Sequence, residues 1–153
     1  MSRQSAFESY RAGADVYAGA ALCKQKAEEL HEEHHLPKGL LPLIDFEEVG
    51  YNRSTGFVWL RQKKPTVHTF KKIGKQTSYA AEVTAVVSDR RMKRLTGIKS
   101  KELLIWITLS EFFIDENEPS KITFRTPAGL SRSFPVSAFE LEEEEEAAAA
   151  EKK

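Results

Sequence analysis

The spacing of apolar residues changes once along this 153-residue chain, from a helical period near the start to short alternating runs afterwards. In the segment 15–35, apolar and small residues recur every three or four positions, on one side of a helix: Val16, Ala20, Cys23, Ala27, Leu30 and His34. Asp15 is a suitable N-cap, and Pro37 ends the pattern because proline disfavours helical backbone at the preceding residue. The spacing predicts one amphipathic helix over 15–35.

Beyond residue 44, short apolar runs separated by polar turns predict about eight strands. The clearest run covers 77–87, where one face is formed by Tyr79, Ala81, Val83, Ala85 and Val87. Turn sequences such as NRSTG (52–56), DENEPS (115–120) and TPAG (126–129) separate the runs. We therefore expect an α+β protein that is mainly β, with the N-terminal helix packed on an antiparallel β-barrel or sandwich.

Two of the predicted strands carry large apolar residues on both faces. These are FVWL (57–60) and LLIWITL (103–109). A strand in an antiparallel sheet with one solvated face alternates between apolar and polar residues, so these two strands need cover on both sides. We expect the N-terminal helix to provide the second cover. A ligand or a second subunit is the alternative.

The composition, 41% hydrophobic and 30% charged, is that of a soluble globular protein, and the length fits one domain. No stretch approaches the roughly 20 apolar residues that a membrane span needs. Residues 1–12, which we expect to be flexible, lack the apolar core of a signal peptide. The single cysteine, Cys23, excludes an internal disulfide. These features predict a cytoplasmic protein, and none of them indicates an oligomer.

Charge is strongly segregated along the chain although the net charge is zero. The balance is −4 over residues 1–52, +11 over 53–101 and −7 over 102–153. The basic runs RQKKPTVHTFKKIGK (61–75) and RRMKR (90–94) would form a positive face if their strands are neighbours. Lysines that keep strand edges from pairing are an equally simple explanation. Nucleic acid is not expected, because the pI is about 6.9 and no RNP-like or zinc-finger pattern occurs. The acidic segment 141–153 predicts a disordered tail.

The stretch HEEHH (31–35) matches the H-E-x-x-H pattern of zinc metalloproteases. A catalytic zinc needs three protein ligands, and His68 is the only histidine outside this stretch, although a carboxylate could also serve as the third ligand. His35 also lies two residues before Pro37, where the helix frays and the four-residue spacing is poorly enforced. We interpret the stretch as a polar helix end, and we expect no metal site, no cofactor and no catalytic residues. Cys23 lies on the apolar stripe, which favours a packing role.

Several longer stretches resemble a plant family, the domain-of-unknown-function family 538. They are LPKGLLPL (36–43), EEVGYNRSTGFVWLRQKK (47–64), SYAAEVTA (78–85), LTGIKSKELLIWITLSE (95–111) and KITFRTPAGLSRSFPVSAFE (121–140). The resemblance covers about residues 13–140, as a single domain of the short form without a signal peptide. It implies a compact antiparallel β-barrel or sandwich with an N-terminal helix, in proteins linked to stress and development. Lipid binding and hydrolase activity are both proposed for the family.

We predict a non-enzymatic binding domain that holds an amphipathic lipid-like molecule or an anionic lipid surface. The expected contacts are apolar ones from Trp59 and Trp106, and anion contacts from Lys63, Lys64, Lys71 and Lys72. Core packing is the competing explanation for both tryptophans. The protein would then be cytoplasmic and peripheral to membranes.

Two other functions stay open on the sequence alone. A hydrolase of pigment or cell-wall esters requires a concave site containing a carboxylate or histidine of shifted pKa. A protein-interaction module would present the basic sheet face to a partner. An apolar cavity of roughly 300 Å³ or more would favour ligand binding over both alternatives.

Overall fold

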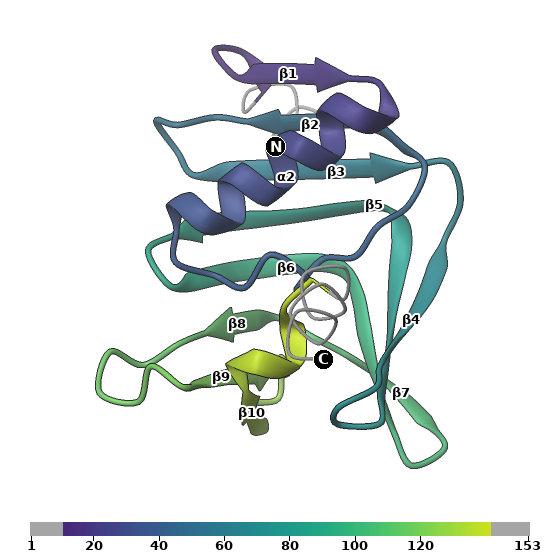
Figure 1. The fold of residues 1–153 in the computed structure, drawn as a ribbon, viewed down its shortest axis with the longest axis vertical. Coiled ribbons are helices and arrows are strands. Elements are labelled where there is room, and N and C mark those ends of the chain that lie inside the picture. The colour runs from purple at the N-terminus through teal and green to yellow at the C-terminus, as the bar shows by residue number, and fades with distance from the viewer. Residues whose placement is uncertain (1–10, 142–153) are drawn as a thin grey trace, which may run out of the picture.

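A computed structural model describes residues 11–141, in which one antiparallel sheet is covered by a single long helix (Figure 1). The expected mainly β fold with one helix is confirmed. Most of the predicted flexible N-terminus and acidic tail, residues 1–10 and 142–153, lies outside the described residues. The elements are β1 (Asp15–Ala18), α2 (Ala20–Glu33), β2 (Phe46–Tyr51), β3 (Phe57–Gln62), β4 (Thr66–Phe70), β5 (Lys75–Ser88), β6 (Arg91–Glu102), β7 (Ile105–Thr108), β8 (Glu111–Phe113), β9 (Lys121–Arg125), β10 (Ser131–Pro135) and the 3₁₀-helix η1 (Val136–Phe139).

The sheet is an open path rather than a closed barrel. Its order is β1-β2-β3-β5-β6-β8-β9-β10, with β4 added beside β5 and β7 beside β6. It has ten strands, two more than the apolar runs predicted. One additional strand is β1, whose residues were predicted to be helical. The other arises because 103–113, predicted as one strand, forms the two strands β7 and β8.

The long strands β5 and β6 form a hairpin, and each neighbouring strand pairs with only part of its length. Along β5, residues 82–86 pair with β3 whereas residues 75–79 pair with β4. Along β6, residues 91–93 pair with β8 whereas residues 99–102 pair with β7. The β5–β6 register shifts between these halves. As a result, the β4–β5 turn and the β6–β7 turn lie at the same end of the molecule (Figure 1).

Helix α2 begins five residues later than the apolar spacing predicted. Gly19 has a φ of 95°, which an L-residue rarely adopts and which interrupts the helical backbone. Residues 15–18 form β1 and pair with β2, so Asp15 is not the N-cap. The helix ends at Glu33, and His35 has a φ of 57°.

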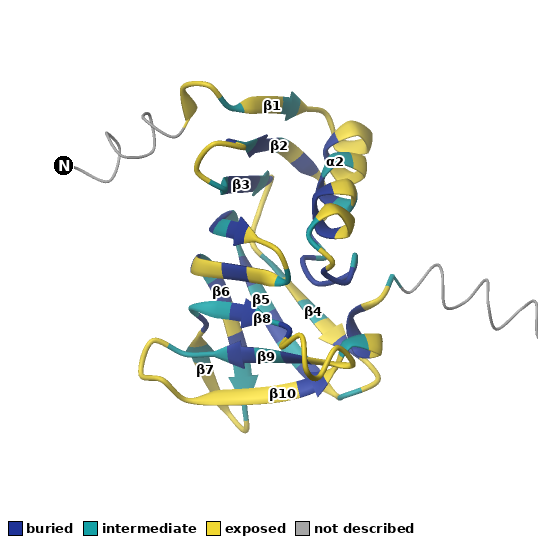
Figure 2. Ribbon diagram, turned by 90° about the vertical axis from the view of Figure 1, so that its left-hand side faces the viewer, coloured by how far each residue is buried: buried dark blue, intermediate teal, exposed yellow. Residues whose placement is uncertain are grey.

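The core is one cluster of buried apolar residues that extends from α2 to η1, as the burial colours in Figure 2 show. Under α2, Cys23 and Leu30 pack in the core with Val58 and Leu60 of β3. Below, η1 brings Phe139 into an aromatic group, with ring centroids 4.7 Å from Phe70 and 5.1 Å from Phe124. Between residues 11 and 141, no helix is long and apolar enough to cross a membrane.

Candidate functional site

The histidines of HEEHH point to different parts of the structure. The buried His31 ring has Nδ1 2.6 Å from the Ala27 carbonyl oxygen. His34 Nε2 lies 3.2 Å from the Tyr51 hydroxyl, and the exposed His35 has Nδ1 2.5 Å from an Asp89 carboxylate oxygen. His31 and His35 therefore do not converge on one point. Among the residues described, no group of three or more His, Cys, Asp or Glu side chains could hold a metal ion.

His31 is a packing residue of the interface between α2 and the sheet. Burial lowers its pKa to about 4, because the charged ring would lose its hydration there. Nδ1–H donates to Ala27, and Nε2 has no hydrogen-bond partner within the described part of the chain. The ring is therefore neutral at pH 7.

Trp59 is fully buried, at 0% exposure, against the neighbouring strand. Its indole lies over Gly50, where an added Cβ would be 2.0 Å from the ring atom Cζ2. Nε1–H donates to Glu48 at 2.8 Å, and the Arg11 guanidinium lies 5.4 Å from the ring centroid. The hydrogen bonds from Arg11 and Trp59 and the charge of Arg61 hold the pKa of Glu48 down at about 2. Trp59 therefore offers no surface to a ligand in this structure.

Trp106 belongs to an exposed apolar turn, which we call the hairpin tip and define as residues 103–106. Glu102 pairs with Ile105, so Leu103 and Leu104 form a two-residue turn between β6 and β7. The exposures are 94% for Leu103, 89% for Leu104, 66% for Ile105 and 39% for Trp106. Leu103 has a φ of 55°, which costs a bulky L-residue about 1 kcal/mol. Hairpin turns of this length normally use Asn or Gly, so an apolar, strained turn is unusual.

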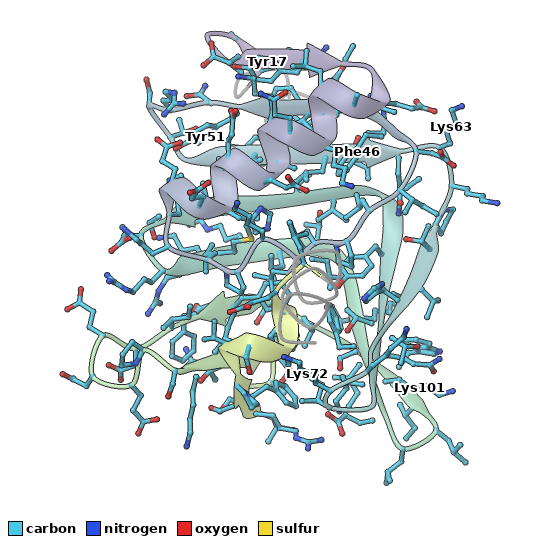
Figure 3. The ribbon with its side chains drawn as sticks, in the orientation of Figure 1. Tyr17, Phe46, Tyr51, Lys63, Lys72 and Lys101 are labelled. Carbon is cyan, nitrogen blue, oxygen red and sulfur yellow. The ribbon has the colours of Figure 1, made fainter. Side chains whose placement is uncertain are left out.

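Two lysines of β6 lie beside the hairpin tip. Lys101 Nζ lies 5.7 Å from the Trp106 ring centroid, and Lys99 is exposed on the same face of β6. Lys71 and Lys72 lie in the β4–β5 turn at this end of the sheet, but Lys72 Nζ donates to the Ser137 carbonyl of η1 at 3.3 Å, away from Lys101 (Figure 3). The hairpin tip with Lys99 and Lys101 forms a positively charged, apolar projection.

The basic runs also include residues that lie elsewhere, at positions 63–64 and 90–91. Lys63 and Lys64 precede β4 and are separated from Lys71 by that strand, about 17 Å at 3.3 Å per residue (Figure 3). Arg90 and Arg91 lie at the opposite end of the β5–β6 hairpin, where they form ion pairs with Asp89, Glu116 and Glu111. The four lysines predicted from the sequence thus form two separate pairs.

A cleft of about 170 Å³ lies beside the hairpin tip, between β6–β7 and β9–β10. Its apolar lining consists of Ile107, Leu109, Phe124, Leu130 and Phe134. Its polar lining consists of Ser100, Glu102, Thr126, Ser131 and Arg132. Neither this cleft nor a shallow pocket of about 280 Å³ at the end of α2 reaches the roughly 300 Å³ of a typical ligand site.

Glu102 and Arg132, two charged residues of the cleft lining, form a group with the buried Lys75 behind them. Glu102 accepts hydrogen bonds from the buried Lys75 ammonium and, at 2.7 Å, from Arg132. Both cations also lie near the Phe134 ring, at 5.6 Å and 5.3 Å from its centroid. Burial alone would raise the pKa of Glu102, but the hydrogen bonds and charges of Lys75 and Arg132 outweigh it and lower the pKa. A carboxylate held in this way is a poor proton acceptor, which does not suit a hydrolase.

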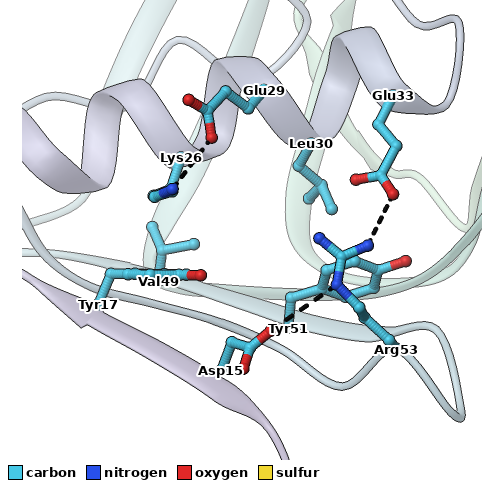
Figure 4. Close-up of a pocket in the computed structure, with 9 residues that line it drawn as sticks. All are labelled: Asp15, Tyr17, Lys26, Glu29, Leu30, Glu33, Val49, Tyr51 and Arg53. Carbon is cyan, nitrogen blue, oxygen red and sulfur yellow. Dashed lines mark hydrogen bonds and ion pairs between the residues drawn. The ribbon is translucent and has the colours of Figure 1, made fainter.

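A second, smaller cavity of about 60 Å³ lies between α2 and the strands β1 and β2 (Figure 4). Arg53 bridges Glu33 at 2.7 Å and Asp15 at 3.7 Å across its mouth. Lys26 is paired with Glu29 at 3.2 Å along the helix. The two Arg53 ion pairs tie α2 to β1 and to the β2–β3 loop, so the cavity has a structural role.

Residues 27–140 match the model of a family described as "Protein of unknown function, DUF538". The chain belongs to the DUF538 family. The resemblance predicted from the sequence is thereby confirmed. No curated protein matches the chain, and no solved structure matches it. The DUF538 region contains the hairpin tip, its lysines and the cleft, whereas β1 and the first turns of α2 precede it.

Trp106, Lys71 and Lys72 were predicted from the sequence, whereas most of the hairpin tip and all of the cleft were not. Leu103 and Leu104 look like strand residues, since neither is a typical turn former. The sequence did not indicate that Lys75 is buried, because it lies in a lysine-rich run. The one available signal was the pair of apolar faces in 103–109, for which we expected cover by the helix.

Proposed function

We propose that this DUF538 protein docks on an anionic lipid surface through the hairpin tip. The observation that carries the proposal is the run of four exposed apolar residues at a turn flanked by lysines. Large exposed apolar groups on a soluble domain usually mark an interaction site. Docking of this kind would hold the protein at the periphery of a membrane.

The composition of the hairpin tip matches the layers of a bilayer surface. Leu103 and Leu104, at the end of the turn, would enter the acyl region and leave water. Trp106, one pair further back, would lie at the interface, where tryptophan is enriched. The lysines would remain among the headgroups, each contributing about 1 kcal/mol against an anionic leaflet.

Two observations favour a lipid surface over the other candidates. A stable protein–protein interface buries about 800 Å² on each partner, which a single two-residue turn does not provide. A wholly enclosed lipid would need a larger cavity than the 170 Å³ of the cleft. A narrow projection is suited to insertion between lipids.

Liposome flotation with the double variant Leu103→Ser/Leu104→Ser tests the apolar contribution. Each leucine withdrawn from water contributes about 1.5 kcal/mol, so we expect partitioning into phosphatidylserine-containing vesicles to fall about 100-fold. The matched control is Ile44→Ser, which removes an exposed apolar residue in the loop before β2. Equal flotation of the double variant and the parent would refute the proposal.

A second pair of variants tests which lysines face the membrane. We expect Lys99→Gln/Lys101→Gln to weaken binding about 30-fold at low salt, from about 1 kcal/mol per charge. Lys63→Gln/Lys64→Gln removes the same charge on the far side of β4 and should leave binding within about twofold. If the two variants bind equally weakly, lysines on both sides of β4 attract the protein to the vesicle, and the hairpin tip does not set its orientation.

A further inference from the structure

The cleft beside the hairpin tip combines an apolar lining with one exposed cation. Five of its lining residues are apolar, and two of them, Phe124 and Phe134, are buried aromatics. Arg132 and Glu102 also line the cleft, and Glu102 accepts a second hydrogen bond from the buried Lys75, which is not part of the lining. An apolar cleft lined by an arginine whose carboxylate partner is already neutralised by a lysine matches an amphiphile with an anionic head.

We infer that this cleft binds the part of an alkyl chain next to the carboxylate of an amphiphile, and that the carboxylate lies against Arg132. The inference rests on the proposed function, since docking through the hairpin tip would bring the cleft to the lipid surface. It adds a ligand class, a single-chain carboxylate such as a fatty acid. It also has a test of its own with soluble ligands.

The size of the cleft limits how much of the ligand it holds. An apolar cavity of about 150 Å³ binds benzene, so 170 Å³ accepts only a few carbons of a chain. The cleft is bordered by Glu102 and Ile107, on either side of the hairpin tip, and by the exposed Leu130 of the β9–β10 turn. With the carboxylate at Arg132, the carbons beyond those few would lie outside the cleft along these residues.

Arg132 is the residue that can meet an incoming carboxylate. Its side chain is 60% exposed and held over Phe134, with one ion pair, to Glu102, among the described residues. Lys75, in contrast, is buried and committed to Glu102 and to the Lys101 carbonyl. Because Lys75 already compensates Glu102, the Arg132 guanidinium can donate to a second anion.

Calorimetric titration of the full chain with sodium carboxylates, from butanoate to dodecanoate and below their micelle concentrations, tests the cleft. Each methylene that enters an apolar site raises affinity about fourfold, from the free energy of burying one CH₂. We expect this increase up to the length that fills the cleft and a plateau beyond it. Affinity that rises without a plateau would indicate adsorption on the hairpin tip and would refute the inference.

Arg132→Gln and Arg125→Gln form a matched pair for the headgroup. The two arginine side chains are 60% and 43% exposed, both pair with a glutamate and both lie over a phenylalanine ring. We expect Arg132→Gln to weaken octanoate about tenfold and leave octanol unchanged, whereas Arg125→Gln changes neither. Equal octanoate affinity in the two variants would contradict a carboxylate site at Arg132.

Ser100→Leu separates this inference from the proposed function. Ser100 lines the cleft, and a leucine there fills the space without touching the hairpin tip. We expect this variant to lose octanoate binding and to float with liposomes like the parent. If the parent floats but does not bind octanoate, only the cleft inference fails. If it binds octanoate but does not float, only the lipid-surface proposal fails.

Discussion

The two tryptophans lie in regions of opposite character, although their sequence surroundings look alike. Each lies in a short run, 57–60 or 103–109, that has apolar residues on both faces of the strand. Trp59 is fully buried across Gly50, whereas Trp106 is exposed at the hairpin tip. Apolar residues on both faces of a strand therefore have two explanations. Either a second layer of protein covers the strand, or one face is an exposed surface available for binding. Burial alone distinguishes them.

Replacing each tryptophan by alanine tests this comparison most directly. We expect Trp59→Ala to cost about 3–5 kcal/mol of unfolding free energy, because it leaves a cavity and removes the hydrogen-bond donor of Glu48. Trp106→Ala should cost under about 1 kcal/mol and weaken liposome binding instead. Urea denaturation of both variants measures the difference. Comparable destabilisation by the two would show that the hairpin tip is part of the folding core.

A fall in pH should weaken the helix-covered region but not the hairpin tip. The His31 pKa of about 4 in the folded protein lies below its ordinary 6.5, so the unfolded chain binds a proton first as pH falls. Stability is then complete above about pH 6.5 and declines toward pH 4, by about 3 kcal/mol in total.

Denaturation from pH 7 to pH 4 should show that decline in the parent and lose most of it in His31→Met. Hydrogen exchange would locate the effect, with earlier loss of protection in α2 than at the β6–β7 pair. The same slope in both proteins would assign the pH dependence to other groups.

Gly50→Ala tests how tightly the buried tryptophan is held. The added Cβ would fall within 2.0 Å of the indole, so Trp59 must move from its bond with Glu48. We expect a loss of about 2 kcal/mol, typical of overpacking in a rigid core, and a red-shifted emission in a Trp106→Phe background. A control change of Leu104→Ala at the hairpin tip should alter stability by less than about 0.5 kcal/mol.

The sequence was most informative where local patterns and burial agree, as in β2, β3 and the helix stripe at Cys23, Ala27 and Leu30. It failed where a distant strand decides the outcome. Residues 15–18 fit the helical spacing, but pairing with β2 extends them, with Gly19 at the break. Residues 103–109 look like one strand, because no turn-forming residue marks the point where Glu102 and Ile105 pair.

The candidate site was less predictable than the fold for the same reason. The lysines were visible in the sequence, but their division into separate groups follows from the length and register of β4. Lys75 meets Glu102 only because β5 and β6 are aligned at that end of the hairpin. A charge run therefore predicts a positive surface, and the register decides which charges share it.

The smallest expected effect separates strain from polarity at the hairpin tip. Leu103 has a positive φ and Leu104 does not, so Leu103→Asn relieves strain whereas Leu104→Asn changes only the polarity of the turn. Asparagine tolerates the left-handed region, so we expect Leu103→Asn to raise the unfolding free energy by about 1 kcal/mol and Leu104→Asn to leave it unchanged.

Both asparagine variants should weaken liposome binding to a similar extent, since each removes one apolar side chain from the hairpin tip. If Leu103→Asn raises the unfolding free energy and weakens lipid binding, the leucine lowers the stability of the fold and is present for binding. Equal stability of the two variants would mean that the turn accommodates leucine without strain. The unusual residue at this position would then be explained by its apolar surface alone.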